Sequence, residues 1–542
     1  MMNNPLKRSA LLTLSILAMS MSHAALAAKS DGAEAAPVVT ITQGSLRGAV
    51  EQGIKVYRGI PFAAAPVGNL RWRAPQTAPS WSGVRDATRF GPVCPQLLRE
   101  GYSLETLGGR PMAEDCLHLN VWTADVSPAT RRPVMVWILP GGFTVGDAGM
   151  ERYDGRVLAT QGVVVVTFNY RLGMLGTFAH PALSRAQPDE PLGNYNLMDQ
   201  IAALKWVRAN VAAFGGDPSN VTIFGMSAGG MSVNYLMASP ASAGLFDKAI
   251  SESSALRMLT ERHLTQDQPK LPSLETEGQA IAGRFGLDDD AAVVQRMRAL
   301  TMEQVLDYQS KHALGVGGGL GPVVDGQIVT RPVGEAFRSG AQHRIPYLTG
   351  ATNWESSLVA KGVPAAPILG AINVTRDQAD AVYHERDDTT LNNKIYSEFF
   401  LSTQRYLAKQ HARAGSPSYV YLFSRVLDQH VGDFFGAAHG ATTRYVFGTL
   451  DGAALLETAD RPGKFGYRVV DSDRRYADLI RSYWVQFAKT GDPNGEGLPG
   501  WPAVSPDNDL MLEFAQHAPV VRRDYHLEPW QFFEAHFEAG KL

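Results

Sequence analysis

Residues Val221–Met231 read VTIFGMSAGGM and place Ser227 between a short β-type run and a helix-compatible run. A serine in the pattern G-x-S-x-G is typical of a nucleophile held on a sharp strand-to-helix turn. Gly225 and Gly229 lack a Cβ, so the strand and the helix can approach closely at this point. The sequence therefore predicts that the Ser227 hydroxyl stands clear of a sheet, above the N-terminus of a helix.

The segments around this turn predict an α/β fold with a mostly parallel, doubly wound sheet. The runs PVMVWIL, residues Pro133–Leu139, and Val163–Asn169 are continuously apolar, as expected of strands buried on both faces. Met198–Phe214 has an apolar residue every three or four positions and is predicted to be an amphipathic helix. Strand, helix and strand in succession indicate a parallel crossover. The more polar segments 260–345 and 360–415 are expected to be helical excursions over the sheet and the active site.

Composition and the N-terminal residues predict an exported globular protein. The chain has 542 residues, of which 45% are hydrophobic and 19% charged, which is enough for a large core. Two basic residues, an apolar run and the small-x-small site Ala25–Ala27 identify residues 1–27 as a signal peptide. Residues 28–542 are expected to be a single periplasmic or secreted domain. The net charge of −3, without a basic cluster, argues against nucleic acid and anionic membrane surfaces as partners. No cysteine directly follows the N-terminal apolar run, and Arg171 interrupts the longest later apolar stretch, so no membrane anchor is expected.

The stretch ahead of the first apolar strand is rich in proline and contains both cysteines. Residues 68–75, GNLRWRAP, are expected to be an extended surface connection. Cys94 and Cys116 are the two cysteines of the chain, and an even number in an oxidising compartment favours one disulfide. Two buried thiols are the alternative.

An acid and a histidine must complete a site around Ser227, because a serine hydroxyl attacks only when an oriented base takes its proton. On a strand–turn–helix scaffold the expected chain order is serine, acid, histidine. Glu355 follows the strand-like segment PYLTGATNW and is the candidate acid, with Asp325 as its rival. His439, in GAAHGATTRYVFG, is the candidate base, and His430, nine residues upstream, is its rival.

Backbone amides that could bind a developing oxyanion are expected from two places. Ala228 supplies one amide at the start of the helix after the serine. The turn that follows PVMVWIL supplies others from Gly141 and Gly142, where missing side chains admit a substrate carbonyl. Pro140 has no N–H and therefore cannot donate.

These segments together resemble the type-B carboxylesterase family of α/β-hydrolases, which includes cholinesterases, bacterial p-nitrobenzyl esterases and fungal lipases. The resemblance covers nearly all of the mature chain. It rests on YRGIPFA, EDCLHLNVW, PVMVWI with GGF, VVVTFNYRLG, GNYNLMDQIAALKWVRANVAAFGGDPSNVTIFG, SAGG, GPVVDG, HG with YVFG, and FAKTGDPNG.

The resemblance implies an α/β-hydrolase fold and a role for each candidate residue. It implies a triad of Ser227 as nucleophile, His439 as base and Glu355 as the acid that orients the base. It further implies that Gly141, Gly142 and Ala228 form an oxyanion hole. It also implies a disulfide between Cys94 and Cys116.

Three features depart from the pattern of that family. Leu139 and Pro140 stand where the family commonly has His-Gly. Met226 replaces a Glu before the nucleophile, and Thr442 replaces a Glu three residues after the histidine. In the family the two acids lie near each other, and a single buried carboxylate without its partners would be costly. Their joint loss predicts that Met226 and Thr442 form a less charged floor beneath the site.

The loop between the cysteines bears on the substrate. It contains no tryptophan, and its only aromatic residue is Tyr102. Cholinesterases carry a cation-binding tryptophan on this loop, so neutral aliphatic or aromatic esters are expected rather than choline esters. The predicted activity is that of a serine carboxylesterase working through an acyl-enzyme, with no metal or organic cofactor. An amidase or carbamate hydrolase with the same triad, and a non-catalytic cholinesterase-like binding protein, are the alternatives.

Overall fold

The computed structural model describes most of the chain after the predicted signal peptide. The described residues are 36–99, 102–255, 262–269, 271–287, 290–312, 320–359, 362–451 and 469–540. They belong to one compact unit that runs from Ala36 to Leu542. The predicted signal peptide, residues 1–27, lies outside the described residues. Within the described ranges, no helix is both long enough and apolar enough to cross a bilayer.

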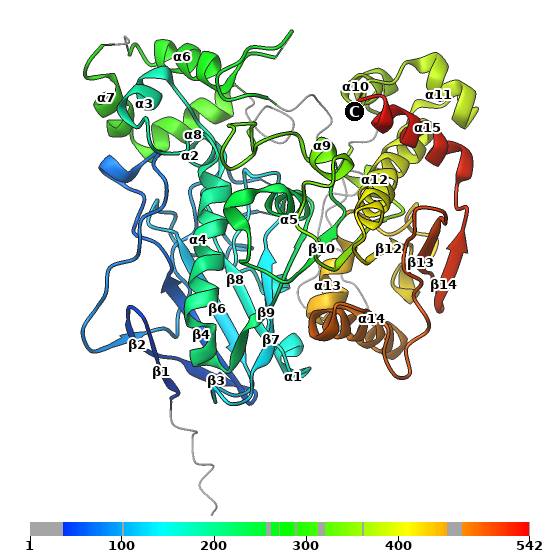
Figure 1. Ribbon diagram of the computed structural model, residues 1–542, viewed down its shortest axis with the longest axis horizontal. Coiled ribbons are helices and arrows are strands. Elements are labelled where there is room, and N and C mark those ends of the chain that lie inside the picture. Colours follow the sequence, from blue (N-terminus) through cyan, green and yellow to red (C-terminus); the bar gives the residue numbers. More distant parts are fainter. Residues whose placement is uncertain are drawn as a thin grey trace, which may run out of the picture. The chain divides into compact units, whose positions relative to one another are not determined.

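A large mixed sheet forms the centre of this unit (Figure 1). Its strands are β3 (Ala49–Glu51), β4 (Ile54–Pro61), β6 (His118–Thr123), β7 (Arg132–Ile138), β8 (Val164–Phe168), β9 (Gly216–Met226), β10 (Lys248–Glu252), β11 (Tyr347–Thr352), β12 (Ser418–Phe423), β13 (Leu510–Phe514) and β14 (Pro519–Arg523). A small second sheet contains β1 (Val38–Ile41), β2 (Gly44–Arg47) and β5 (Val84–Asp86).

The strand order of the large sheet is β14-β13-β12-β11-β10-β9-β7-β8-β6-β4-β3. The run from β13 to β8 is parallel, and the remaining pairs at the two ends are antiparallel. The apolar runs of β7 and β8 are almost completely buried, because helices cover both faces of the parallel part. The predicted mostly parallel sheet is therefore confirmed.

The helices pack in layers on the sheet. They are α1 (Arg156–Thr160), α2 (Gly173–Gly176), α3 (Pro181–Ala186), α4 (Tyr195–Asn210), α5 (Ala228–Ala238), α6 (Leu274–Arg284), α7 (Val293–Ala299), α8 (Met302–Lys311), α9 (Val333–Arg338), α10 (Ala365–Ala371), α11 (Arg376–Tyr383), α12 (Asp388–Arg413), α13 (Ala441–Phe447), α14 (Asp471–Thr490) and α15 (Leu527–Glu538). The predicted helix 198–214 corresponds to α4 and to the 3₁₀ turn Val211–Phe214 that follows it.

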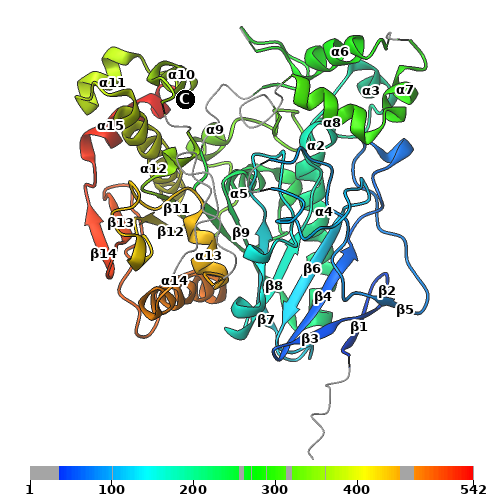
Figure 2. The ribbon, with the colours of Figure 1, turned by 180° about the vertical axis from the view of Figure 1, so that it is seen from behind.

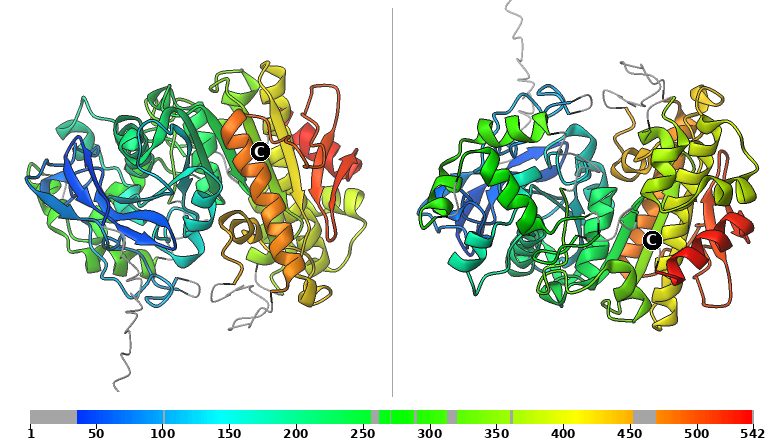
Figure 3. Two further views of the ribbon diagram at one scale, coloured as in Figure 1. Left: turned by 90° about the horizontal axis from the view of Figure 1, so that it is seen from below. Right: turned by 90° about the horizontal axis from the view of Figure 1, so that it is seen from above.

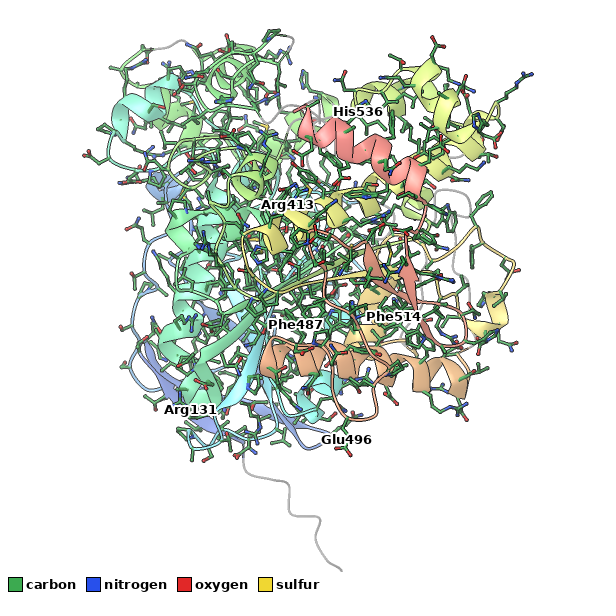
Figure 4. All side chains as sticks on the ribbon, turned by 45° about the vertical axis from the view of Figure 1, so that its right-hand side comes forward. Arg131, Arg413, Phe487, Glu496, Phe514 and His536 are labelled. Atoms are coloured by element: carbon green, nitrogen blue, oxygen red, sulfur yellow. A yellow bond between two sulfur atoms is a disulfide. The ribbon has the colours of Figure 1, made fainter. Side chains whose placement is uncertain are left out.

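The two faces of the sheet carry different helices. Figure 1 shows α4, α5 and α12 in front of the strands, and α5 packs on β9 and β10 while α12 packs on β11 and β12. Seen from behind in Figure 2, α13 and α14 lie against each other, and α14 contacts β7 and β9. On the apolar side of α14, Tyr483 and Trp484 pack against Phe514 at the end of β13. Phe487, also on α14, packs against Tyr419 on β12, and both Phe487 and Phe514 are fully buried (Figure 4).

The excursions predicted at 260–345 and 360–415 are helical in their described parts. One group contains α6, α7 and α8 together with α3, and the other contains α10 and α11 together with α15. These groups stand apart at the top of Figure 1 and in the view from above in Figure 3.

The nucleophile turn is built on three close backbone approaches. A Cβ at Gly229 on α5 would lie 2.0 Å from the carbonyl oxygen of Ile138 at the end of β7. A Cβ at Gly225 would lie 2.6 Å from the backbone of Gly229, and one at Gly230 would lie 2.7 Å from the carbonyl oxygen of Glu252. Glycine is required at these positions because any side chain would push the helix away from the sheet.

The cysteines form the disulfide that the family resemblance implied. Cys94 and Cys116 are joined, with a Cα–Cα distance of 5.1 Å. The closed loop restricts the unfolded chain, which is worth about 3 kcal/mol on the entropic model.

The prediction that residues 68–75 form an extended surface connection is wrong. Trp72 is 1% exposed, and its indole N–H donates to the carbonyl of Met174 at 2.9 Å. Arg71 is also buried, in an ion pair with Glu114. The segment is rich in proline but contributes a large anchor to the core, and the burial of Trp72 outweighs the local preference for an exposed connection.

We expect Gly229→Ala to destabilise the protein by about 3 kcal/mol or more and to abolish activity, because the new methyl group meets a backbone carbonyl that cannot move alone. Gly283→Ala is the matched control, since Gly283 also lies in a helix and a Cβ there meets no atom within 4 Å. This control should gain about 0.5–1 kcal/mol from helix propensity. Thermal unfolding of both variants tests the difference, and equal stabilities would contradict it.

Candidate active site

Ser227 sits between β9 and α5 in a strained backbone conformation, with φ 57° and ψ −121°. Such a conformation costs free energy and persists only where the surroundings enforce it. Here the Ser227 N–H donates to the carbonyl of Glu252 at 2.9 Å, and its own carbonyl accepts from the Met231 N–H at 2.8 Å. The predicted turn of strand, serine and helix is present.

The turn after β7 leaves two amides free beside the start of α5. The Gly141 carbonyl accepts from the N–H groups of Thr144 and Val145, both at 3.1 Å, which closes a tight turn. Gly141 and Gly142 have φ values of 116° and 63°, in the region that favours glycine. Within the described part of the chain, the amides of Gly141, Gly142 and Ala228 donate to no acceptor. These three donors are therefore available for an oxyanion.

Two flanking contacts hold this turn in place. The Tyr170 hydroxyl donates to the carbonyl of Leu139 at 3.0 Å, and the Gly173 N–H donates to the carbonyl of Phe143 at 2.8 Å. Leu139 and Pro140, which replace the His-Gly of the family pattern, are buried. The departure therefore changes the side chains next to the amides but leaves the amides themselves free.

The candidate acid and base form a buried pair. Glu355 begins a 3₁₀ turn after β11 and is fully buried, and His439 immediately precedes the N-cap of α13. The Nδ1 of His439 contacts the Glu355 Oε2, and the Glu355 Oε1 accepts from the Thr352 N–H at 2.7 Å. A carboxylate at Nδ1 fixes the histidine with Nε2 as the proton acceptor and stabilises the imidazolium.

The loops that carry this pair extend the pairing of neighbouring strands. β11 and β12 are parallel partners, and beyond their ends Trp354 pairs with Ala438 in a parallel bridge. Asn353 clamps the two loops, because its side-chain oxygen accepts from the Ala437 N–H at 2.8 Å and its N–H donates to the carbonyl of Phe423. The acid and the base thus occupy a continuation of the sheet rather than free loops.

The nucleophile and the base come together through adjacent residues. Gly440, next to His439, packs against Met226, next to Ser227, so closely that a Cβ on Gly440 would lie 2.6 Å from the Met226 Cε. The Ser227 hydroxyl and the His439 Nε2 share no hydrogen bond, and this buried nitrogen has no partner among the described residues. Such bonds commonly tighten only when substrate is bound.

The rival residues have other contacts. Asp325 accepts from the side chain of Asn194 and from the N–H groups of Gln327, Ile328 and Val329, so it organises a turn. His430 pairs with Asp433, three residues away, at 3.0 Å. Both rivals thus have hydrogen-bond partners other than the Glu355–His439 pair.

The floor beneath the site contains a carboxyl group that sequence reasoning missed. Glu252 is fully buried at the end of β10 and pairs in register with Met226. Its Oε2 accepts from the Thr442 hydroxyl at 2.8 Å and its Oε1 from the Trp484 indole at 2.9 Å. Burial raises the pKa of Glu252 to about 7, against the two hydrogen bonds, which lower it. The predicted floor of Met226 and Thr442 is therefore incomplete.

Comparison with known proteins decides the family. The model of the carboxylesterase family matches residues 35–405 and 371–533. The chain belongs to the carboxylesterase family. It is a carboxylic ester hydrolase of the serine type, and the predicted α/β-hydrolase fold is confirmed.

Individual relatives of this carboxylesterase agree over most of its length. The fumonisin B1 esterase of Sphingopyxis macrogoltabida is 32% identical over 88% of this chain and 86% of its own. The para-nitrobenzyl esterase of Bacillus subtilis (strain 168) is 34% identical over 86% and 92%. A solved PNB esterase structure superposes with a TM-score of 0.76 at 30% identity, covering 91% of this chain and 99% of that one.

The buried carboxyl group of Glu252 predicts a pH-dependent stability. Its pKa is about 7 in the folded carboxylesterase against 4.5 in a model peptide, so the folded state holds the proton more tightly. Stability should therefore fall as the pH rises from about 4.5 to about 7, by about 3 kcal/mol.

Glu252→Gln removes this dependence, because Gln keeps one acceptor for Trp484 and one donor for Thr442 but cannot ionise. The free energy of unfolding of the variant minus that of the unmodified protein should be about 3 kcal/mol larger at pH 8 than at pH 5. Urea unfolding at both values measures the difference. A difference that does not change with pH would contradict it.

Proposed function

We propose that this carboxylesterase hydrolyses neutral aliphatic or aromatic esters through an acyl-enzyme on Ser227. The observation that carries the proposal is the buried Glu355–His439 pair, whose Nε2 has no partner among the described residues, beside a strained serine. The free amides of Gly141 and Ala228 on two different elements complete the arrangement. Nucleophile, base, orienting acid and oxyanion donors are the parts that acyl transfer requires.

In the proposed mechanism, the Ser227 hydroxyl attacks the ester carbonyl carbon while His439 Nε2 takes its proton. The carbonyl oxygen becomes an oxyanion that accepts from the amides of Gly141, Gly142 and Ala228. Glu355 stabilises the imidazolium, which then gives its proton to the leaving alcohol. A water molecule then attacks the acyl carbon while His439 takes its proton. The bond between the acyl carbon and the Ser227 Oγ breaks, His439 returns the proton to that oxygen, and the acid leaves.

The charges around the cysteine loop support a neutral substrate. The guanidinium groups of Arg99 and Arg152 lie 5.3 Å and 5.7 Å from the centroid of the Tyr102 ring. The one aromatic residue of the loop thus faces cations of the protein itself, and a quaternary ammonium there would meet like charge. Met226 beside the nucleophile adds no anion that could attract such a group.

The comparisons support an ester as the reactive bond. The matched relatives include a fumonisin B1 esterase and a para-nitrobenzyl esterase, whose names describe different alcohols or acids. The shared element in these names is ester hydrolysis, which agrees with the donor and nucleophile arrangement of this chain.

We further propose that the protein is exported, on the basis of the basic, apolar and small-residue pattern of residues 1–27. The Cys94–Cys116 disulfide agrees with an oxidising compartment. N-terminal sequencing of the protein from its native host should find a mature chain that begins at residue 28. An intact residue 1 would contradict export by cleavage.

His439→Gln should lower kcat by about 10³-fold or more, because it removes the base while keeping a similar shape. His430→Gln is the matched control and should stay within about twofold of the unmodified protein, since His430 pairs with Asp433, three residues away, rather than with Glu355. Turnover of p-nitrophenyl butyrate measures both. A large loss in the His430 variant, or none in the His439 variant, would overturn the assignment of the base.

Substrate class is tested with one acyl group on three leaving groups. The kcat/KM for p-nitrophenyl butyrate should exceed that for butyrylthiocholine by at least about tenfold, because the aromatic ring of the cysteine loop, Tyr102, already faces two arginines. It should also exceed that for butyryl p-nitroanilide. Faster turnover of the anilide would identify an amidase. A binding protein would be indicated if the folded protein hydrolysed none of the three substrates and an organophosphate failed to label Ser227.

A further inference from the structure

Glu252 has contacts that the acyl-transfer mechanism does not use. It is the last residue of β10 and lies between Met226 on β9 and Gly350 on β11 in the sheet register. Its neighbour Ser251 donates to the carbonyl of Gly230 on α5, at 3.0 Å. Because side chains alternate along a strand, the Glu252 carboxyl group points to the opposite face, toward α13 and α14.

One residue therefore touches both halves of the proposed site. The Glu252 carbonyl accepts from the N–H of Ser227 at 2.9 Å, which helps to hold the strained nucleophile. The Glu252 carboxyl group accepts from the hydroxyl of Thr442 at 2.8 Å, and Thr442 lies three residues after His439 on the helix that follows it. The indole of Trp484 on α14 fixes the second carboxyl oxygen at 2.9 Å.

Among the described residues, the Glu252 carboxyl group has no cationic partner. The residues that face it from the packed elements are Met226 from β9, Thr442 from α13 and Trp484 from α14, and none of them is charged. Tyr421 on β12 is a titratable neighbour, and it also feels the charge of Glu355. Burial, followed by the charges of Glu252 and Glu355, raises the pKa of Tyr421 well above its usual value, so its phenol stays neutral.

A fully buried acid whose described partners are two neutral donors is costly for stability, and a neutral side chain would fill the same space at a lower cost. Groups of this kind cluster at functional sites, where an acid near neutrality has a task. The two family acids near this place are replaced by Met226 and Thr442, which leaves Glu252 as the carboxyl group beneath the pair in the described structure.

We propose that Glu252 is a positioning residue of this carboxylesterase: it ties the backbone of Ser227 to the helix behind His439, and its negative charge supports the imidazolium. The proposal rests on the proposed function of Ser227 and His439. The link through Thr442 sets the position of α13 relative to the nucleophile turn. The charge acts at the moment when His439 carries the proton, since a buried carboxylate stabilises a nearby cation strongly in a low dielectric.

The positional part is tested at two adjacent threonines. Thr442→Val deletes the hydroxyl that bonds to Glu252, whereas Thr443→Val deletes a buried hydroxyl that has no partner among the described residues. Thr442→Val should lower kcat for p-nitrophenyl butyrate about tenfold with KM nearly unchanged, because the base is displaced from the nucleophile. Thr443→Val should keep kcat, and Thr442→Ser, which restores the hydroxyl, should recover it.

The electrostatic part is tested by pH. Glu252→Gln has the same shape but no charge, and Glu252 itself is mostly protonated below its pKa of about 7. The ratio of kcat for the unmodified protein to kcat for Glu252→Gln should be near one at pH 5.5 and about tenfold at pH 8.5. A purely structural effect would lower kcat by one factor at both values.

Three results would overturn the proposal while leaving the proposed function intact. They are equal kcat for Thr442→Val and the unmodified protein, equal losses for Thr442→Val and Thr443→Val, and a kcat ratio for Glu252→Gln that does not change with pH. Failure of the proposed function is different, because the unmodified protein would then show no hydrolysis of the ester. Thermal unfolding of each variant confirms that the comparison is made on folded protein.

Discussion

The contact between Gly229 on α5 and the carbonyl of Ile138 on β7 determines the geometry of the proposed site. It is the closest of the three approaches around Ser227, and it brings the start of α5 against the end of β7. Gly141 and Gly142 lie three and four residues after Ile138, and Ala228 precedes Gly229. The same contact therefore forces the serine into its strained conformation and brings oxyanion donors from two elements together. A side chain at residue 229 would push the start of α5 away from the end of β7 and would disturb both the serine conformation and the oxyanion donors.

Parallel strands supply the remaining groups at one edge of the sheet. β9, β10, β11 and β12 are consecutive parallel neighbours, and each ends in a residue or loop of the site. β9 leads to the nucleophile, β11 to the acid and β12 to the base, while β10 ends in Glu252. Because the carboxyl ends of parallel strands meet at the same edge, residues more than 200 positions apart become neighbours. The bridge between Trp354 and Ala438 carries the same pairing into the site itself.

The parts of the site that are local in sequence could be predicted from it. The nucleophile turn, the apolar strands and the glycines after β7 each follow from a short pattern. The choice of Glu355 over Asp325 and of His439 over His430 depended on their positions after strand-like segments and on the family resemblance, since both rivals fit the expected chain order equally well. The structure separates them because Asp325 organises a turn and His430 pairs with Asp433 within its own loop.

Long-range contacts explain what the sequence did not reveal. Glu252 bonds to Thr442 and Trp484, which lie 190 and 232 positions away, so no short pattern could indicate its role. The one available signal was an acid at the end of an apolar, strand-like run, KAISE. Trp72 was misplaced for a similar reason, because its partner Met174 lies 102 positions away.

A crystal structure of the protein inactivated by a phosphonate ester would test the account most directly. The account predicts a covalent bond between phosphorus and the Ser227 Oγ, a phosphoryl oxygen that accepts from the amides of Gly141, Gly142 and Ala228, and His439 Nε2 within hydrogen-bond distance of the adduct. An adduct on another residue, or a phosphoryl oxygen turned away from those amides, would contradict it.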